Sequence, residues 1–344
     1  MVAKWNGVQK RVRQLPQSIQ RLRYVEESLE IVVAAGEELW WLAPGALPSD
    51  AVAPAAVPWC WPRHAWRLDG RITALCAYSG LVGTENGHVS LYRRASAGDD
   101  CGADVALDDS NLSRAFRAPP ALPSLSVSAM AVVGIAPGVL ATDDGELLLL
   151  AEPLDAAAPT LYARDGVGFV ALAASQSPHE VVTASRSGAI AVWDTRTPYR
   201  SRLERRTTMV AASAFGPLRL ATPAHSRILT LDLDERRLVG GSEHGHLLEW
   251  DVRRPDVVLQ VARRHDGPVL EVRWVRGGTP RLGAASCGID GRVYLGSDHQ
   301  GAERVVCGGP GTDYARTVDV HRGGELGCYG GDAGLLVEVF LQSG

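Results

Sequence analysis

The stretch Val181-Val-Thr-Ala-Ser-Arg-Ser-Gly188-Ala-Ile-Ala-Val-Trp193-Asp194 contains two short apolar runs on either side of a tight turn. Two-residue turns of the Ser-Gly type are a standard signal for a hairpin between antiparallel strands. We therefore expect one strand at Glu180 to Ala184, a turn at Ser187-Gly188 and a second strand at Ala189 to Asp194. A third strand is predicted before them, at Phe169 to Ala173, so the unit consists of strands joined by short connections.

The same unit recurs along the whole chain of 344 residues. Each copy has a turn glycine, and in most copies a large or strand-forming residue follows five positions later, as Trp193 follows Gly188. The turn glycines are Gly36, Gly87, Gly145, Gly188, Gly245, Gly291 and Gly334. A strand-only repeat of about 43 to 58 residues is typical of a β-propeller with four strands per blade. We predict an all-β, seven-bladed propeller that forms a single domain over residues 1–344.

The position two residues beyond each turn glycine predicts which strand face is buried. It is apolar in six copies, which suits a strand face packed against a neighbouring blade. These residues are Val89, Leu147, Ile190, Leu247, Val293 and Leu336. The first copy departs from the pattern, because Glu38 stands there.

The last copy has no room for an outer strand of its own, because its third strand runs out at Phe340. An open edge of this kind invites pairing with another chain, so we expect another segment to cover it. The segment Val8 to Arg13 precedes the first copy, alternates weakly and stops before Pro16. We predict that this N-terminal segment closes the last blade by pairing with Leu335 to Phe340.

Two insertions interrupt the repeats. Residues 43–62 are rich in Pro and Ala, and residues 95–109 contain five aspartates together with Gly and Ser. Low hydrophobicity and clustered charge predict a mobile loop for the second insertion. A solvated loop is its plain interpretation, and a loop that becomes ordered on a partner is the alternative.

Charge and cysteine usage exclude several classes of function. The formal net charge is −4, and no basic stripe interleaves with aromatic residues, so direct nucleic-acid binding is not expected. No apolar run approaches the roughly 20 residues of a membrane span, so we expect a soluble intracellular protein. The cysteines lack a Cys-x-x-Cys pair, which suits neither a zinc site nor a disulfide framework and favours a reducing compartment. They are Cys60, Cys76, Cys101, Cys287, Cys307 and Cys328.

Three residues of the sixth copy could form either a hydrogen-bond network or a catalytic triad. His265 precedes the first strand, Ser286 lies in the second strand and Asp290 lies in the turn. No Gly-x-Ser-x-Gly elbow presents a nucleophile, so we interpret the set as a structural network that ties the strands together. A tryptophan would complete the network, but Gly296 stands at its position. The fourth and fifth copies have Trp193 and Trp250 there.

Other polar residues near the turns have plain structural interpretations. His244 and His246 flank a turn glycine, but two ligands do not make a metal site and no third is identifiable. Glu249 and Glu338 stand where an apolar residue is usual, and burying an unpaired carboxylate is costly. We expect each to meet an arginine or water, or to lie near the rim. No catalytic residue, metal, cofactor or small-molecule ligand is predicted.

Arginines gather after the third strands of the fourth and fifth copies. Such a positive rim would serve solubility alone, or it would form forked pairs with the carboxylates of an acidic protein partner. On the second interpretation, the predicted partner-binding residues are Arg200, Arg202, Arg205, Arg206, Arg253 and Arg254.

The copies that end in Trp193-Asp194-Thr-Arg196 and Trp250-Asp251-Val-Arg253 resemble the WD-repeat family, and this resemblance covers nearly the whole chain. Three stretches are similar to a WD-repeat nucleoporin of the Y-shaped nuclear pore scaffold. They are Ala3 to Trp5 with Gln9-Lys10 and Arg13 to Pro16, the two Trp-Asp-x-Arg repeats leading to His265 and Glu271-Val272, and Thr317 to Val320 with Gly330 to Ala333. The resemblance implies a non-catalytic scaffold subunit at the nuclear envelope that docks on a helical-solenoid nucleoporin of one short arm.

The Trp-Asp-x-Arg pattern supports a second function as well. It resembles the box by which WD-repeat substrate receptors of cullin-RING ubiquitin ligases meet their adaptor. A propeller enzyme is a third candidate, and it would need a metal or a pair of catalytic carboxylates that the sequence does not reveal. A rigid ring without a chemical centre offers two faces and a rim for protein contacts, so a protein-binding scaffold is our main prediction.

Overall fold

The computed structural model describes twenty segments that cover most of the predicted strands. In these segments the chain forms 29 β-strands and no helix. The described residues are 2–5, 8–15, 17–25, 30–42, 64–76, 81–86, 88–92, 112–117, 127–132, 138–150, 160–164, 167–174, 179–196, 218–220, 227–254, 256–275, 283–297, 303–307, 314–321 and 326–340.

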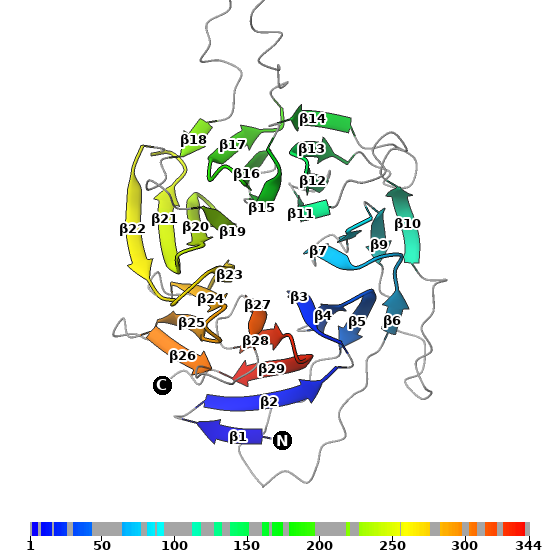
Figure 1. The fold of residues 1–344 in the computed structure, drawn as a ribbon, viewed down its shortest axis with the longest axis vertical. Coiled ribbons are helices and arrows are strands. Elements are labelled where there is room, and N and C mark those ends of the chain that lie inside the picture. The colour runs from blue at the N-terminus through cyan, green and yellow to red at the C-terminus, as the bar shows by residue number, and fades with distance from the viewer. Residues whose placement is uncertain are drawn as a thin grey trace, which may run out of the picture.

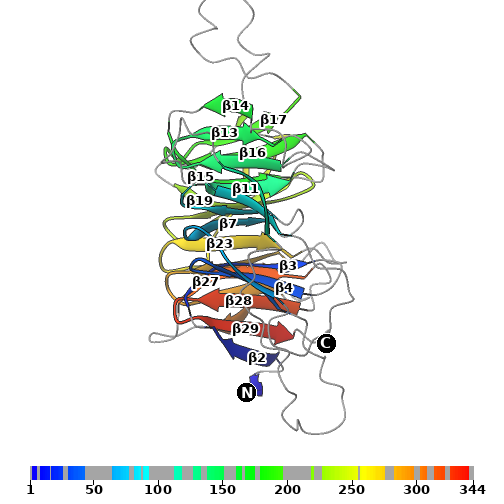
Figure 2. The same ribbon diagram turned by 90° about the vertical axis from the view of Figure 1, so that its right-hand side faces the viewer.

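The described strands assemble into seven antiparallel sheets, six of four strands and one of five. Figure 1 shows the sheets arranged around a common centre, each with one edge toward that centre. The innermost strands of successive sheets contact one another in order, and the innermost strand of the last sheet contacts that of the first. From the side the molecule is flatter than it is wide, and the strands run across its thickness (Figure 2). This all-β architecture is consistent with a β-propeller.

Each sheet follows the chain outward from the centre (Figure 1). The innermost strands are β3 (Ile19–Val25), β7 (Ile72–Cys76), β11 (Val127–Val132), β15 (Phe169–Ala174), β19 (Ile228–Asp234), β23 (Val269–Trp274) and β27 (Ala315–Val320). The second strands are β4 (Glu30–Ala35), β8 (Leu81–Thr84), β12 (Gly138–Thr142), β16 (Glu180–Ser185), β20 (Arg237–Ser242), β24 (Ala284–Gly288) and β28 (Leu326–Gly331).

The outer half of each sheet contains the third strand and one further strand. The third strands are β5 (Glu38–Leu42), β9 (His88–Tyr92), β13 (Glu146–Leu149), β17 (Ile190–Asp194), β21 (His246–Asp251), β25 (Val293–Ser297) and β29 (Leu335–Phe340). The outer strands are β6 (His64–Arg67), β10 (Leu112–Arg117), β14 (Thr160–Arg164), β18 (Leu218–Leu220), β22 (Val258–Arg263), β26 (Glu303–Cys307) and, in the last sheet, β2 (Val8–Gln14) followed by β1 (Val2–Trp5).

The strand boundaries of the fourth repeat agree with the sequence prediction to within a residue. The three predicted strands correspond to β15, β16 and β17. The two insertions, residues 43–62 and 95–109, lie outside the described residues, so the predicted mobile loop stays a prediction.

The turn glycines occupy the backbone conformation that the hairpin interpretation requires. Six of the seven have positive φ, and Gly87 lies outside the described residues. Position 245 requires a glycine for a second reason as well. A Cβ there would collide with the carbonyl oxygen of His265. The turn therefore brings the second and third strands of this sheet close to the loop that leads to the next sheet.

The core lies between neighbouring sheets, as the apolar pattern predicts. The six apolar residues that stand two positions beyond the turn glycines are at most 6% exposed. One of them, Ile190, packs in a cluster with Leu248 and Trp250 of the following sheet. A similar cluster joins Ile19 and Leu22 of β3 to the last sheet, so the apolar packing also continues between the two ends of the chain.

The N-terminal segment provides the outer strand of the last sheet. Strand β2 pairs antiparallel with β29, with Gln9 opposite Phe340 and Gln14 opposite Leu335. This is the pairing that the missing outer strand of the last copy predicts. Strand β1 then adds outside β2 (Figure 1), so the edge of β29 is covered by two strands.

Candidate protein-binding surface and central polar network

The predicted arginine rim lies only partly within the described residues. Arg253 and Arg254 follow β21 directly, at the end of the sheet where the turn between β19 and β20 also lies. Four other members fall outside the described part of the chain, so their placement stays a prediction. They are Arg200, Arg202, Arg205 and Arg206.

Arg253 is held by an acidic side chain two positions before it. Asp251 accepts hydrogen bonds from the backbone N–H of Arg253 at 3.0 Å, from its Nε at 2.9 Å and from its Nη2 at 2.6 Å. These hydrogen bonds lower the pKa of the Asp251 carboxyl to about 2. Asp194 and Arg196 repeat this geometry in the neighbouring sheet, with distances of 3.0, 3.0 and 2.7 Å. In the Asp-x-Arg sequences of these two repeats, the aspartate therefore forms an ion pair with the arginine and fixes the position of its guanidinium.

Arg254 and Arg236 differ from Arg253, because both are exposed and neither makes an ion pair with any described residue. Arg236 lies in the turn between β19 and β20, where its carbonyl accepts a hydrogen bond from the N–H of Val252 at 2.9 Å. The two arginines thus share one end of the sheet. Arg236 was missed in the sequence because a turn and two strands separate it from Arg254.

The structure brings His265, Ser286 and Asp290 together. The His265 ring lies 2.9 Å from Asp290 Oδ1 through Nδ1 and 2.9 Å from Ser286 Oγ through Nε2. Asp290 also accepts hydrogen bonds from the backbone N–H groups of Asp266 and Arg292, at 3.0 and 3.1 Å. These contacts tie the loop before β23 to strand β24 and to the turn before β25.

This set has the members of a catalytic triad but is closed to substrates. His265 and Ser286 are both 0% exposed. Burial lowers the pKa of His265, and this effect outweighs the neighbouring Asp290. Burial would raise the pKa of Asp290, but the hydrogen bonds from His265 and from two backbone N–H groups lower it overall. A neutral imidazole therefore holds an ionised carboxylate, and the Ser286 hydroxyl has no access to solvent.

The tryptophans named from the sequence lie in the third strands of their sheets. Trp193 on β17 donates a hydrogen bond from Nε1 to Thr183 Oγ1 at 2.8 Å. Trp250 on β21 is fully buried between two sheets. In the sixth repeat the ring of Tyr294 instead meets the His265 ring edge-on, with centroids 5.0 Å apart. The sixth repeat thus supplies the His, Ser and Asp of the hydrogen-bond network, and the tryptophans lie in the fourth and fifth repeats.

Of the two unusual glutamates, Glu338 is buried and Glu249 is half-buried. Glu249 meets an arginine, as expected, because Arg237 donates a hydrogen bond to it from Nε at 2.7 Å. The same guanidinium lies over the Trp274 ring, 5.3 Å from its centroid. Glu338 on β29 is 7% exposed.

The histidines and cysteines offer little reactive chemistry in the described part of the chain. His244 is exposed and His246 is half-buried. No group of three or more His, Cys, Asp or Glu side chains among the described residues is placed to hold a metal ion. Burial raises the pKa of the Cys287 and Cys328 thiols well above the ordinary value, which makes them poor nucleophiles.

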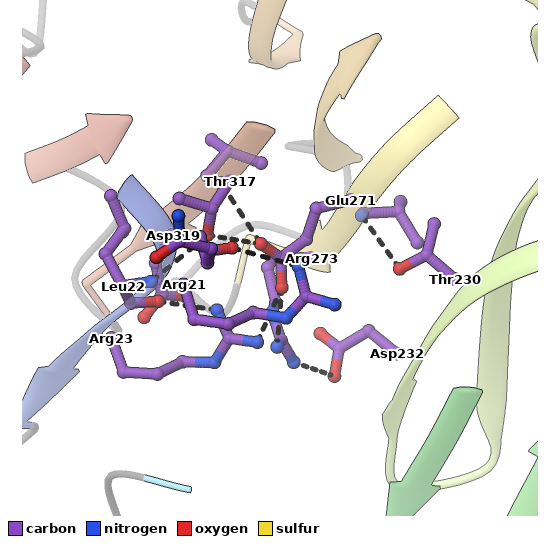
Figure 3. A network of polar contacts seen from close by, with 12 residues as sticks. Arg21, Leu22, Arg23, Thr230, Asp232, Glu271, Arg273, Thr317 and Asp319 are labelled. Atoms are coloured by element: carbon purple, nitrogen blue, oxygen red, sulfur yellow. Dashed lines mark hydrogen bonds and ion pairs between the residues drawn. The ribbon is translucent and has the colours of Figure 1, made fainter. Parts of the chain in front are cut away.

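A polar network that the sequence interpretation missed lies among the innermost strands (Figure 3). It is built from pairs of residues two positions apart, whose side chains point to the same side of a strand. The pairs are Arg21 and Arg23 on β3, Thr230 and Asp232 on β19, Glu271 and Arg273 on β23, and Thr317 and Asp319 on β27. The sequence signal was a period-two polar pattern in strands whose other face is apolar.

Glu271 is the centre of this network and is 4% exposed. Its Oε1 accepts hydrogen bonds from Arg23 Nη2 at 2.5 Å and from Arg273 Nη2 at 2.9 Å, so two sheets share one carboxylate. Its Oε2 accepts from the Thr317 hydroxyl and from the N–H of Val318 in a third sheet. Burial alone would lower the pKa of Arg23, but nearby carboxylates, Glu271 first among them, raise it. The network therefore links three sheets through one residue.

Side chains of the same network satisfy backbone donors of the next strand. An innermost strand has one edge without a strand partner, so the N–H groups on that edge need other acceptors. Thr230 Oγ1 accepts from the N–H of Val272 at 3.3 Å, and Asp232 Oδ2 accepts from the N–H of Trp274 at 2.7 Å. Strand β19 is thereby tied to β23.

Strand β27 repeats this arrangement toward β3. Thr317 Oγ1 accepts from the N–H of Leu22 at 3.2 Å, and Asp319 Oδ2 accepts from the N–H of Tyr24 at 2.8 Å. The corresponding positions on β7, β11 and β15 hold small residues without a side-chain oxygen. They are Ala74, Cys76, Ala129, Ala131, Ala171 and Ala173. Among the described residues, side-chain oxygens at these positions therefore lie on β19, β23 and β27.

Comparisons with known proteins leave the family open. No protein-family model matches the chain, and no curated protein matches it. Among the described residues, no helix is long and apolar enough to cross a membrane.

Proposed function

We propose that this chain is a seven-bladed WD-repeat β-propeller that serves as a non-catalytic scaffold subunit of the nuclear pore complex. In this role it docks on a helical-solenoid nucleoporin of one short arm of the Y-shaped complex at the nuclear envelope. As part of that scaffold it contributes to the passage of protein and mRNA through the pore. The proposal rests on one observation. The antiparallel sheets form a ring, and the side chains that could act in catalysis, His265, Ser286 and Glu271, are engaged in hydrogen bonds that hold its strands and sheets together.

The stretches that resemble a Y-complex nucleoporin occupy structural positions in the ring. Gln9-Lys10 lies in β2, which covers the edge of β29. Glu271 and the Thr317 to Val320 stretch contribute to the central network. These placements support a rigid docking platform, and a rigid platform is what a scaffold subunit needs.

We propose a non-catalytic role because the side chains that could act in catalysis are buried or already bound to other groups of the protein. Ser286 is buried beneath His265, and the Glu271 carboxylate is bound by two guanidiniums, a hydroxyl and a backbone N–H. A base or nucleophile must reach a substrate atom at hydrogen-bonding distance, and neither group is available for that.

A ubiquitin-ligase substrate receptor remains the second candidate because of one observation. Arg196 and Arg253 have the same fixed geometry in neighbouring sheets, each held by the aspartate two positions before it. A repeated, preorganised pair of arginines of this kind would suit an adaptor protein as well as a nucleoporin.

Affinity purification of the full chain from native cells, with identification of the co-purifying subunits, tests the proposal. Helical-solenoid nucleoporins are the expected result, and a ligase adaptor in their place would favour the second candidate. Charge reversal of Arg202, Arg205 and Arg206 to Glu should then weaken the purified complex about tenfold or more at physiological salt. The melting temperature should change little, because the proposal assigns these arginines to the partner contact and not to the fold. Unchanged binding by this triple variant would show that these three arginines are not part of the contact.

A further inference from the structure

Exposed apolar side chains are concentrated at one outer strand of the ring. Among the described residues three of the seven exposed large apolar side chains lie on or next to β22: Val257 is 42% exposed, Leu259 is 43% exposed and Val261 is 52% exposed. Outer strands usually carry charged side chains, because an exposed apolar edge promotes unwanted pairing. A cluster of this kind therefore indicates a contact surface, which we call the β22 strip.

The pairing of β22 shows which face of the sheet Val261 lies on. Val261 lies opposite Leu248 of β21, so the two side chains share a face of the sheet. Leu248 packs in the cluster that joins this sheet to the preceding one, which contains β15 to β18. Val261 is thus at the outer margin between two sheets. The pairing register shifts between Val258 and Gln260, which makes Leu259 the extra residue of a bulge.

The bulge limits what can cover the strip. A bulge interrupts the regular row of N–H and C=O groups that an added strand would need, and proteins use it to block edge pairing. Strand addition, including addition of β22 from a second copy of the chain, is therefore disfavoured. A helix needs only side-chain contacts, so it can lie along the exposed edge of β22 and contact exposed apolar side chains there without adding a strand.

The charges at one end of the β22 strip indicate which kind of helix would bind there. The carbonyl of Arg254 accepts a hydrogen bond from the N–H of Val257 at 3.2 Å, which places Arg254 beside the strip. Arg254 and Arg236 are both exposed, and neither forms a salt bridge with another described residue, although Arg236 is near enough to Asp251 to lower the pKa of its carboxyl. Guanidinium groups bind carboxylates through two parallel hydrogen bonds, so they complement an acidic flank. Asp256 is exposed between Arg254 and Val257 in the sequence and would oppose that flank.

We propose that the β22 strip, with Arg236 and Arg254 at its end, docks an amphipathic α-helix with an acidic flank from a helical-repeat protein. The inference rests on the proposed function, since it assigns the contact surface for the helical partner. The carboxylates of the helix face Arg236 and Arg254, and its apolar stripe contacts exposed apolar side chains of the strip.

Photo-crosslinking in the full chain identifies what covers the strip. A photoreactive amino acid replaces Val261, and the control replaces Leu161, which is 49% exposed on the outer strand β14. We expect an adduct with a helical-repeat protein from position 261 and none from position 161. An adduct only with a second copy of the chain, or no adduct from position 261, would overturn the proposal.

Affinity measurements with the recombinant helical-repeat subunit that co-purifies with the chain test the chemistry of the contact. Val261→Asp should weaken binding about tenfold or more, whereas Leu161→Asp should leave it unchanged. Asp256→Asn should strengthen binding roughly twofold, because it removes a charge that repels the acidic flank. Weaker binding by Asp256→Asn would show that the covering helix is basic, and the proposal would be wrong. Equal melting temperatures exclude a folding defect, because these side chains are exposed.

The two proposals fail in different ways. If helical-solenoid nucleoporins co-purify but Val261→Asp binds them as tightly as the wild type, the strip is not the contact and the scaffold function stands. If position 261 crosslinks to a helical-repeat protein outside the nuclear pore, the docking inference stands and the proposed function is wrong.

Discussion

Glu271 shows how a single buried residue can couple several sheets. Its carboxylate is 4% exposed and binds guanidiniums from β3 and β23. A buried ion pair contributes little net stability by itself, but removing one partner leaves the other charge buried without compensation. Substitution at this residue should therefore cost far more than substitution in an ion pair on the surface.

Glu271→Gln keeps the volume of the side chain and removes its charge. We expect the free energy of unfolding to fall by about 3 to 5 kcal/mol, because Arg23 and Arg273 lose their shared carboxylate. The matched control is Glu37→Gln, which breaks a pair with Arg67 in which both side chains are about half exposed or more. That control should cost at most about 1 kcal/mol. Urea unfolding of both variants checks the prediction, and similar small losses in the two would contradict it.

Asp290 tests whether the triad-like set is structural. Asp290→Ala removes the acceptor for the His265 ring and for two backbone N–H groups. We expect a loss of about 1 to 3 kcal/mol in the free energy of unfolding. Asp256→Ala, at an exposed aspartate, should change it by less than about 0.5 kcal/mol. A wild-type esterase or peptidase activity that disappears in Asp290→Ala would overturn the structural interpretation.

The same set predicts how stability depends on pH. The pKa of His265 is lowered in the folded protein by burial, so the unfolded chain binds a proton there at a pH where the folded protein does not. This contribution to stability is fully present above the ordinary histidine pKa of 6.5 and is lost as pH falls from there through the lower pKa of the folded protein. Asp290 acts in the same direction at lower pH, since its folded pKa lies below 3.8.

We therefore expect the free energy of unfolding to decrease between about pH 7 and pH 5, with a contribution from His265. In His265→Gln the slope over this range should flatten, because the titrating group is gone. The wild type is the reference, measured in the same buffers. Equal slopes in the wild type and in His265→Gln would show that His265 does not titrate as proposed. Denaturant titrations at a series of pH values measure the slopes.

At the level of strands and sheets, the sequence predicted local features better than contacts between sheets. Turn glycines with positive φ and buried residues two positions later follow from backbone geometry and from the period of two, which are local properties. The pairing of β2 with β29 was also predictable, because the last copy visibly lacked an outer strand. Each of these inferences needed only the spacing of residues within or between repeats.

The contacts of the central network and the ion pairs of the arginines could not be predicted from residue spacing. Glu271 meets Arg23 across 248 positions of sequence, and only the ring arrangement brings them together. Arg253 stays a predicted partner-binding residue, and the structure adds that its guanidinium is bound to Asp251. The repeat spacing showed where Arg253 lies along its strand and could not show that an ion pair already holds it.

Deletion of residues 1–14 tests the strand that completes the last sheet. The deletion removes β2 and β1 and exposes the edge of β29, so we expect a lower melting temperature and aggregation. Deletion of residues 1–7 is the matched control, because it removes β1 and leaves β2 on β29. This control should melt close to the wild type and stay soluble. Wild-type melting and a monomeric gel-filtration profile for the longer deletion would refute the structural role of β2.

On the scale of the whole molecule, the ring is held together unequally around its centre. Side chains on β19, β23 and β27 accept hydrogen bonds from the next innermost strand. The equivalent positions of β7, β11 and β15 offer only small side chains without oxygen. Neighbouring sheets pack apolar faces everywhere, so the additional polar ties distinguish one side of the ring from the other. A local opening should therefore begin on the side that lacks these ties.

Hydrogen exchange of single backbone amides measures this asymmetry. We expect the N–H groups of Leu22 and Val272, which donate to threonine side chains, to exchange more slowly than that of Leu172 at the equivalent position of β15. The acceptor facing Leu172 would have to come from position 129, and that residue is alanine. In Thr317→Val the Leu22 amide should lose its protection and resemble Leu172, while Val272 should keep its slow exchange because its acceptor is Thr230. If Leu172 is protected as strongly as Val272 in the wild type, the ring is uniformly stable and the polar network does not determine where it opens.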